Sequence, residues 1–444
     1  MDKTDWPVTE PQIAVGLLEG VDGAAFELFS AYRLQDTVLL PGRYSVCVEQ
    51  DSVIVSASGK KIAAAESLEL RPIENGPGSF VLDSIPIGKS FHWERLRSLR
   101  YQGELALGTF GGRELTVINR IPLERYLASV ISSEMSSGCP AEFLKAHCVA
   151  SRSWLLAQLQ AKKEQARHTG SGREQWTDAT KHHAFDVCAD DHCQRYHGTE
   201  KVNATVDEAL RRTRGEVLAD GDEICDARFS KCCGGITERF ATAWDDRDPA
   251  YLVPVIDAPE HRSCGFFPAS EESVARSFIA AEPDVYCNVR DAALLERVLP
   301  DFDFETNDFF RWEVQISQEE LGALLLKRAG LDIGRIKAMV PLARGASGRI
   351  YSLRVVGEKG ERIFGKELEI RRVLSSSHLY SSAFIVEALP ERGGVPEGFV
   401  LQGAGWGHGV GMCQIGAAAM AAGGRQYREI LAHYFQGAQL HTLY

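Results

Sequence analysis

Residues 122–160 read PLERYLASVISSEMSSGCPAEFLKAHCVASRSWLLAQLQ, and they mark the point where the sequence changes from a strand-like to a helical texture. The first part, LERYLASVISSEM, has the apolar spacing of a helix that buries one face. Pro140, a residue type favoured in the first turn of a helix, begins a second predicted helix that runs towards Lys162. Two consecutive helices are therefore predicted after a segment of strands.

The preceding segment, from about Gln12 to Arg120, predicts mainly β-strands. Short β-branched runs alternate there with turn signals that contain proline and glycine; the runs are QIAVGLL, SVCVEQ, SVIVSAS, SFVLDSI and LTVINRI. No grouping of catalytic residue types occurs in this first part of the chain. Residues 1–100 are therefore predicted to form a β-rich accessory domain.

Residues 101–444 are predicted to form a second domain, in which all candidate catalytic groups lie. The polar stretch around 166–199 predicts a loop. Residues 255–345, the least informative part, predict an insertion that contains the helix SQEELGALLLKRAG, with Gly330 as its stop. Strands (IYSLRVVG, GFVLQGAG) and final helices (QIGAAAMAAGG, YREILAHYFQG) follow. Because helices and strands are mixed without regular βαβ alternation, the predicted fold class is α+β.

The composition disfavours some classes of partner. Lys and Arg number 49 and Asp and Glu 61, which gives a formal net charge of −12. Such an acidic chain disfavours nucleic acid, because phosphate binding requires a positive field. No stretch approaches the roughly 18 consecutive apolar residues of a transmembrane helix. The N-terminal MDKTDWPVTEPQ lacks the charged-then-apolar pattern of a secretory signal, so no signal peptide is expected in this sequence.

Glu134 is the first candidate catalytic residue. Leu127, Val130 and Ile131 precede it at helical spacing, which places its carboxylate on the apolar face of the first predicted helix. Desolvation at such a position raises the pKa of a carboxyl group and favours a general acid near neutral pH. The alternative is that the helix frays at Met135 and that Glu134 reaches solvent, since glutamate is rarely buried without a partner.

A metal site is predicted within HHAFDVCADDHCQRYHG. Two imidazoles and two thiolates fall there within twelve residues. These four predicted ligands are His182, Cys188, His192 and Cys193. Two nitrogen and two sulfur ligands suit tetrahedral zinc, and four protein ligands leave no open position, so the zinc would be structural. It would order a polar loop that cannot fold on its own apolar surface. His183 and His197 are substitute ligands, and a coincidental cluster is the alternative.

Two glycine-rich elements, SKCCGGIT and GAGWGHGVGMCQIGA, let the backbone approach a ligand closely. GWGHGVG lacks the Lys-Ser/Thr of a phosphate-binding loop and the dinucleotide spacing, so nucleotide binding has little support. A stacking ring at Trp406 with hydrogen-bonding groups at His408 and Gln414 suits a flexible sugar better. The alternative is a tight structural turn that leads into the final helices.

The eleven cysteines cannot all pair as disulfides within one chain, because their number is odd. Three are interpreted as scattered buried thiols: Cys47, Cys148 and Cys287. Cys413 with His408 or His433 would offer a thiol nucleophile and a base. Nothing nearby matches a cysteine-protease signature, however, so this interpretation is set aside.

These segments, in this order, resemble the SpoIID/LytB family, named for stage II sporulation protein D and an amidase enhancer. The resemblance runs from about Leu99 to the C-terminus. It rests on LERYLASVISSEM with PAEFLKAHCVASRSW, on FDVCADDHCQRYHG, on FSKCCGGIT with Trp244, and on GWGHGVGMCQIGAAAMA with EILAHYFQGA. The last block is highly specific. The N-terminal part, with FHWER, is similar to a larger subgroup with an added leading domain.

The resemblance implies a lytic transglycosylase that cleaves the MurNAc–GlcNAc bond of peptidoglycan and leaves 1,6-anhydro-muramic ends. Glu134-Met135 occupies the place of the family's Glu-Met-Pro signature, although Ser136 stands where the proline is expected. Glu134 is accordingly expected to serve as general acid and base on glycan strands denuded of stem peptides. Zinc on a comparable His/Cys cluster is also implied. The candidate substrate contacts are Arg152, Ser230, Thr237, His408 and Gln414.

Two other functions stay open at this point. A non-enzymatic wall-binding protein that stimulates an amidase would bind glycan without forming an anhydro product. A metal-dependent hydrolase would use the His/Cys cluster, but it requires an open position on the zinc. The glycan substrate leads us to expect a cell-envelope or periplasmic location.

Overall fold

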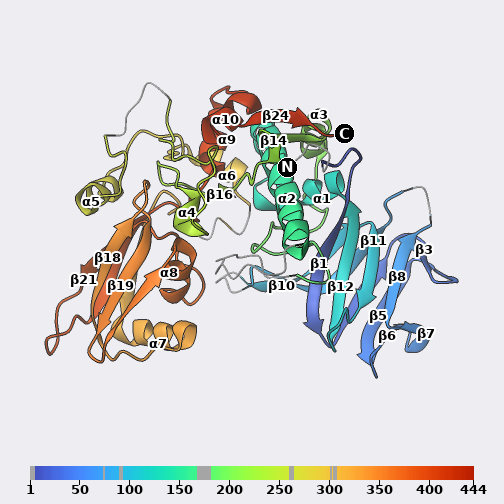
Figure 1. The fold of residues 1–444 in the computed structure, drawn as a ribbon. Helices are drawn as coiled ribbons and strands as arrows, with labels where there is room; N and C mark the ends of the chain where they lie inside the picture. The colour runs from blue at the N-terminus through green and yellow to red at the C-terminus, as the bar shows by residue number, and fades with distance from the viewer. Residues whose placement is uncertain are drawn as a thin grey trace. The chain divides into compact units, whose positions relative to one another are not determined.

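The computed structural model describes residues 6–73, 76–89, 94–167, 182–259, 265–300, 303 and 308–444 (Figure 1). The chain divides into two compact units. The first, which we call the β-rich unit, consists of Asp2–Ser137, Asp178–Glu216 and Thr442–Tyr444. The second, the C-terminal unit, consists of Gly138–Thr177 and Val217–His441.

Two sheets build the β-rich unit. The larger has seven strands in the order β13-β1-β12-β11-β8-β3-β4. Its strands are β1 (Gln12–Val21), β3 (Tyr32–Leu34), β4 (Thr37–Leu39), β8 (Ser67–Pro72), β11 (Glu104–Gly108), β12 (Leu115–Pro122) and β13 (Val187–Cys188). The other has six strands in the order β10-β9-β2-β5-β6-β7. They are β2 (Gly23–Leu28), β5 (Gly42–Glu49), β6 (Ser52–Ala57), β7 (Lys60–Ala65), β9 (Ser79–Ile87) and β10 (Arg95–Gln102).

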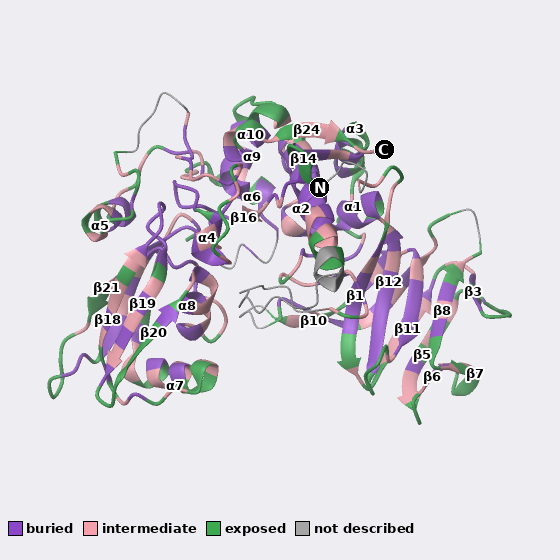
Figure 2. Ribbon diagram, in the orientation of Figure 1, coloured by how far each residue is buried: buried purple, intermediate pink, exposed green. Residues whose placement is uncertain are grey.

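The pairing of β1 with β12 forms the core of the larger sheet. The two strands are antiparallel, with Ile13 opposite Ile121, and both of these side chains are fully buried. β12 is buried along nearly its whole length, as Figure 2 shows, which is typical of a central strand. β9 instead alternates between buried and more exposed residues, which is typical of a strand with one face in a core. The strands predicted from SFVLDSI and LTVINRI are confirmed.

Two helices complete the β-rich unit. α1 (Leu123–Glu134) begins where β12 ends, and ten of its twelve residues are buried. α3 (Ala204–Arg212) begins after Asn203, whose side chain accepts hydrogen bonds from the backbone N–H groups of Thr205 and Val206. Helix α1 therefore follows directly from a buried strand, and its last residue is Glu134.

The C-terminal unit contains α2 (Ala141–Arg167) and several small sheets. Two of them have three strands each: β17 (Arg311–Ser317), β22 (Gly398–Ala404) and β21 (Phe384–Ala388), and β18 (Ile336–Arg344), β19 (Ile350–Gly357) and β20 (Glu361–Gly365). A parallel pair joins β16 (Phe229–Ser230) to β23 (Met412–Cys413). Another sheet contains β14 (Glu216–Asp220), β15 (Glu223–Ile224) and β24 (Gln439–Thr442). The further helices are α4 (Phe240–Ala243), α5 (Glu272–Ala280), α6 (Ala292–Val298), α7 (Gln318–Ala329), α8 (Glu367–Val373), α9 (Gln414–Ala422) and α10 (Tyr427–Tyr434).

Helix α7 shows how the sequence sets an element of the C-terminal unit. Ser317 and Glu320 form a reciprocal capping box at its start, and Gly330 ends it in the left-handed conformation with φ of 63°. Leu321 and Leu325 pack into the core formed with β17, β19 and β22. The helix predicted from SQEELGALLLKRAG, with its glycine stop, is confirmed.

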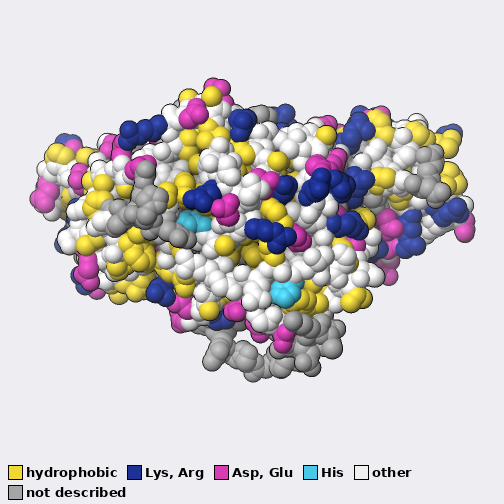
Figure 3. Space-filling view, turned by 90° about the horizontal axis from the view of Figure 1, so that it is seen from above, with side chains coloured by type: hydrophobic (Ala, Val, Ile, Leu, Met, Phe, Trp, Pro, Cys, Tyr) yellow, Lys and Arg dark blue, Asp and Glu magenta, His cyan; other side chains and the backbone are white. Residues whose placement is uncertain are grey.

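The mixture of helices and several separate sheets confirms the α+β class with a β-rich N-terminal region. The β-rich unit runs across the boundary predicted near residue 100, because β1 pairs with β12 and with β13. On the face seen in Figure 3, Lys and Arg side chains are interspersed with Asp and Glu. Among the described residues, no helix combines the length and the apolar character needed to span a bilayer.

Candidate active site and metal centre

Glu134 is the last residue of α1, and its side chain is half-buried. Leu127, Val130 and Ile131 on the same helix face are fully buried, as predicted. At Met135 the backbone becomes extended, with φ of −133° and ψ of 167°. The carboxylate thus lies at the end of a buried helix. Its exposure is intermediate between the two alternatives, a carboxylate buried on the apolar face and one that reaches solvent where the helix frays.

A backbone N–H group binds the carboxylate of Glu134. The N–H of Arg195 donates to its Oε1 at 3.0 Å. One residue earlier, Ser133 Oγ accepts from the N–H of His197 at 3.2 Å. Backbone donors from residues 195 and 197 therefore meet consecutive side chains at the end of α1. Arg195 and His197, which donate these hydrogen bonds, closely follow the predicted metal ligands in the sequence.

Tyr196, between these two donors, anchors the segment in the β-rich unit. Its ring stacks on Tyr126 of α1 at 5.2 Å and on Tyr101 of β10 at 5.4 Å between ring centroids. Its hydroxyl donates to Asn119 Oδ1 at 2.6 Å, and the Asn119 amide donates to two backbone carbonyls. Burial raises the pKa of Tyr196, which keeps its hydroxyl protonated as a donor. Gln194 completes the anchor by accepting from the Tyr126 hydroxyl at 3.1 Å.

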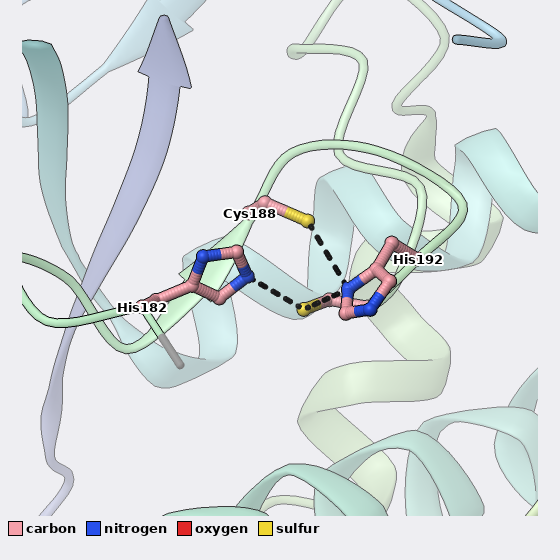
Figure 4. A group of neighbouring side chains, drawn as sticks. His182, Cys188 and His192 are labelled. Carbon is pink, nitrogen blue, oxygen red and sulfur yellow. Dashed lines mark hydrogen bonds between the residues drawn. The ribbon is translucent and has the colours of Figure 1, made fainter. Parts of the chain in front are cut away.

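The four predicted metal ligands come together in this unit. Figure 4 shows His182, Cys188 and His192 pointing towards a common centre. Cys193 Sγ lies 3.6 Å from His182 Nε2 and 3.6 Å from His192 Nδ1, and Cys188 Sγ lies 4.0 Å from the same His192 nitrogen. All four ligand atoms lie within 4.8 Å of one another. The predicted substitutes His183 and His197 do not belong to the group.

The donor set and its spacing fit one zinc ion. With Zn–S of about 2.3 Å and Zn–N of about 2.0–2.1 Å, a tetrahedral site separates sulfur from nitrogen by about 3.6 Å. Hydrogen bonds with Cys193 and the two imidazoles lower the pKa of Cys188 to about 2, so this sulfur is available as a thiolate. Four protein ligands fill a tetrahedral shell, which is the arrangement of a structural site.

Strand β13 places Cys188 within this group. It pairs in parallel with β1, so that Val187 lies opposite Val15 and Cys188 opposite Gly16. Gly16 has no side chain, and a Cβ built there would lie 2.5 Å from the ring of Phe185. Phe185 in turn contacts the His182 ring at 4.5 Å between centroids. We call residues 182–197 the metal loop. It is attached to the larger sheet by strand β13 and by the ring of Phe185.

The five predicted substrate contacts all belong to the C-terminal unit, whereas Glu134 belongs to the β-rich unit. Four of them are buried within the protein: Arg152, Ser230, Thr237 and Gln414. Thr237 Oγ1 accepts from the N–H of Val255 at 2.8 Å, and Gln414 Nε2 lies 3.3 Å from His147 Nε2. Both side chains are thus engaged in internal contacts.

His408 is the more exposed candidate, and the buried Ser230 lies close to the same glycine-rich segment. His408 is half-buried, accepts from the N–H of Val410 at 3.0 Å and meets Trp244 edge-on. Ser230 is only 7% exposed, and no described residue donates to or accepts from its hydroxyl. Gly407 approaches it closely, since a Cβ there would lie 3.0 Å from Ser230 Cβ.

An aromatic group around Trp406 extends what the sequence predicts. Its ring stacks on Tyr380 at 4.4 Å with an interplanar angle of 24°, and Phe309 lies 4.8 Å away. Trp406 is half-buried, so part of its ring is available to a ligand. Tyr380 and Phe309 carry no sequence signal of this role, because they come from distant parts of the chain.

Comparison with known proteins gives two family matches and several relatives. Residues 111–219 match a family described as stage II sporulation protein, and residues 238–411 match a domain of unknown function. An uncharacterized protein of Brachyspira hyodysenteriae is 24% identical over 78% of this chain and 73% of its own. Stage II sporulation protein D of Bacillus amyloliquefaciens is 25% identical over 73% of this chain and 75% of its own. The amidase enhancer of Bacillus subtilis is 25% identical over 71% of this chain and 40% of its own length.

Proposed function

Since this chain belongs to the family of stage II sporulation protein D and the amidase enhancer, we propose that it is a lytic transglycosylase acting on peptidoglycan glycan strands. The family supports a function in the cell wall. The finer assignment rests on Glu134, a half-buried carboxylate held at the end of α1 by the N–H of Arg195.

Glu134 would carry both proton transfers of the reaction. Its carboxylic acid protonates the glycosidic oxygen between MurNAc and GlcNAc as the bond from C1 of MurNAc breaks. The resulting carboxylate then accepts the proton of the C6 hydroxyl of the same muramic residue, and O6 bonds to C1 to close the 1,6-anhydro ring. Because the nucleophile belongs to the substrate, one carboxylate suffices, whereas most glycosidases need two.

The metal loop would position this carboxylate. Zinc held by His182, Cys188, His192 and Cys193 would be structural and would supply order to a polar loop. The loop residue that follows closely, Arg195, presents the N–H that binds Glu134 Oε1. A carboxylate fixed in this way needs little rearrangement before it reacts, which favours catalysis. Four protein ligands also argue against the metal-dependent hydrolase, which needs an open position.

Glycan binding would involve the C-terminal unit. The half-buried ring of Trp406, supported by Tyr380, offers an apolar face on which a sugar ring can stack. Ser230 and His408 lie in the segments that adjoin it, and the buried Arg152, Thr237 and Gln414 would shape the site from behind. Nucleic acid and nucleotides are not expected partners.

Product analysis tests the proposal directly. The purified protein is incubated with denuded glycan and, separately, with peptide-bearing peptidoglycan, and the termini are identified by mass spectrometry. We expect 1,6-anhydro-muramic ends, formed faster from denuded glycan. Hydrolysed reducing ends without anhydro product would exclude a transglycosylase.

Glu134→Gln keeps the size of the side chain and an oxygen for the Arg195 N–H, but removes the proton that is transferred. General acid–base catalysis contributes about 10²–10⁴-fold, so turnover should fall by at least that range while glycan binding persists. Glu208→Gln is the matched control, because Glu208 is an exposed residue of α3 that pairs with Arg211 and Arg212. Near-normal turnover by Glu134→Gln would assign the chemistry to another group.

The name of the Bacillus subtilis relative, amidase enhancer, supports a second candidate function. In that case the protein would bind glycan and stimulate a cell-wall amidase without cutting the strand itself. Wild-type protein that releases no anhydro ends, yet accelerates a purified amidase on peptide-bearing peptidoglycan, would favour this alternative.

A further inference from the structure

A second group of potential metal ligands lies inside the C-terminal unit. Four separate stretches of chain contribute to it, and its members are Cys233, Asp257, Cys287 and Cys413. All four side chains are buried, and their ligand atoms lie within 4.8 Å of one another. Cys287 is buried as predicted, but it is not a scattered thiol. Three sulfurs and a carboxylate converge on one point in the core.

The spacing of the sulfurs separates a metal site from a disulfide. Cys233 Sγ and Cys287 Sγ are 3.6 Å apart. A disulfide bond measures about 2.05 Å, whereas two thiolates on one tetrahedral zinc, with Zn–S of about 2.3 Å, lie about 3.8 Å apart. Cys233 Sγ lies 3.5 Å from Asp257 Oδ2, which matches the corresponding sulfur–oxygen spacing. The distances fit a single ion between these groups.

Backbone donors surround the ligand atoms in the way that stabilises metal-bound thiolates. Cys413 Sγ accepts from the N–H groups of Cys233 at 3.2 Å and of Gly416 at 3.4 Å, at the N-terminal end of α9. Cys233 Sγ accepts from the N–H of Gly235 at 3.4 Å. Donors of this kind and a helix N-terminus both favour negative charge on sulfur. They orient the ligands as an outer shell does around a bound metal.

Asp257 is held in the same manner. Its Oδ1 accepts from the Tyr434 hydroxyl at 2.6 Å, and its Oδ2 accepts from the N–H of Cys287 at 3.1 Å. Gly416 makes room for the carboxylate, since a Cβ there would lie 2.4 Å from Oδ2. The carboxylate is thereby aimed at the sulfurs rather than at solvent.

Three sulfurs and a carboxylate lie side by side in the core, where burial disfavours negative charge on any of them. A dication at the centre would offset the cost of burying several anionic ligands together.

We propose that Cys233, Asp257, Cys287 and Cys413 form a second zinc site, buried in the C-terminal unit and separate from the His/Cys site of the β-rich unit. Three thiolates and one carboxylate select a borderline-soft divalent ion over magnesium or calcium. Four protein ligands leave no open position, so this zinc is structural. It ties β23 and the start of α9 to the segments that carry Cys233, Asp257 and Cys287.

Metal stoichiometry of the full-length chain tests this site independently of catalysis. Protein purified without chelator is analysed for zinc per chain by elemental analysis. We expect two zinc ions in the wild type, one in Cys188→Ser and one in Cys287→Ser. Cys225→Ser, which alters a buried cysteine outside both groups, should retain two.

The Cys188→Ser protein decides the outcome even if Cys287→Ser fails to fold. One zinc retained in Cys188→Ser supports the buried site, including the case in which the wild type holds only one. Zinc absent from Cys188→Ser overturns it. Cobalt offered to the metal-stripped Cys188→Ser protein should give an intense sulfur-to-cobalt charge-transfer band, and its absence would count against three thiolate ligands. An unreduced intact mass lighter by two hydrogens, with no zinc and with Cys233 and Cys287 joined in the peptide map, would show a disulfide at this place instead.

Discussion

At the scale of single residues, the lack of a side chain at Gly16 leaves space for the Phe185 ring, which packs beside the predicted zinc ligand His182. A Cβ at this position would lie 2.5 Å from the Phe185 ring, closer than real side chains approach. Phe185 packs with Ala106 and Ile118 and contacts His182 of the predicted zinc site. A methyl group at residue 16 would therefore displace the ring that seats the metal loop.

Gly16→Ala should lower the free energy of unfolding by about 1–3 kcal/mol, the typical cost of overpacking a core. Gly322→Ala is the matched control, because Gly322 lies in α7 and a Cβ there would meet nothing within 4 Å. This second change should stabilise the protein by about 0.5–1 kcal/mol, since alanine favours the helix. Thermal unfolding of both variants checks the prediction, and equal shifts of the same sign would contradict it.

At the scale of elements, the metal loop and α1 act together. The loop donates to Glu134 and Ser133 and packs Tyr196 between Tyr101 and Tyr126. Without zinc, the polar loop has too few apolar side chains to keep this arrangement by packing alone. The position of the candidate catalytic carboxylate should then depend on the metal, although the metal takes no part in the chemistry.

His192→Ala should remove zinc from this site and reduce anhydro-product formation by about 10²-fold, which is what a misplacement of about 1 Å costs. His183→Ala is the control, because His183 is exposed and is not part of the ligand group. It should keep both its zinc and its activity. Zinc content and turnover are measured on the same preparations. A His192→Ala protein that lacks this zinc and is fully active would separate the loop from catalysis.

The sequence predicts the elements around this site better than their contacts. The periodic apolar residues of α1 and the proline before α2 depend only on neighbouring residues, so both helices are predictable. The zinc ligands are also predictable, since all four fall within one short stretch. The stacking of Tyr196 on Tyr101 and Tyr126, and the convergence of Cys233, Cys287 and Cys413, depend on pairing between distant segments. No local pattern encodes such pairing, and the burial of Thr237 and Gln414 is hidden for the same reason.

At the scale of the whole molecule, buried neutral histidine links folding to pH. His147 of α2 is fully buried, and burial, together with the nearby charge of Lys231, lowers its pKa from 6.5 to about 3. Lys231 itself pairs with Asp303 at 2.7 Å, and the Gln414 amide faces the imidazole. Unfolding exposes the ring to water, where it gains a proton below its ordinary pKa.

Stability should therefore fall as the pH decreases from about 6.5 towards 3, by up to about 1.4 kcal/mol per pH unit from this group. Above 6.5 the ring is neutral in both states and contributes no pH dependence. His147→Gln removes the titrating group and should flatten the acid limb of the stability curve by that slope. Denaturant unfolding at a series of pH values gives the comparison, and parallel curves for the two proteins would show that His147 does not carry this linkage.

The parallel pairing of β13 with β1 has a consequence for synthesis on the ribosome. β1 is among the first strands to emerge, yet its partner on one side, β13, is translated only after all the other strands of the two sheets and after α1 and α2. Until then the nascent sheet presents an open edge, the kind of surface on which chains aggregate. Val187 and Cys188 pair with this edge at the stage when the zinc ligands His192 and Cys193, which follow them in the sequence, are also translated. Zinc supply during translation should thus influence how much chain reaches the native state, and growth under zinc limitation should lower the yield of soluble protein more than it lowers synthesis.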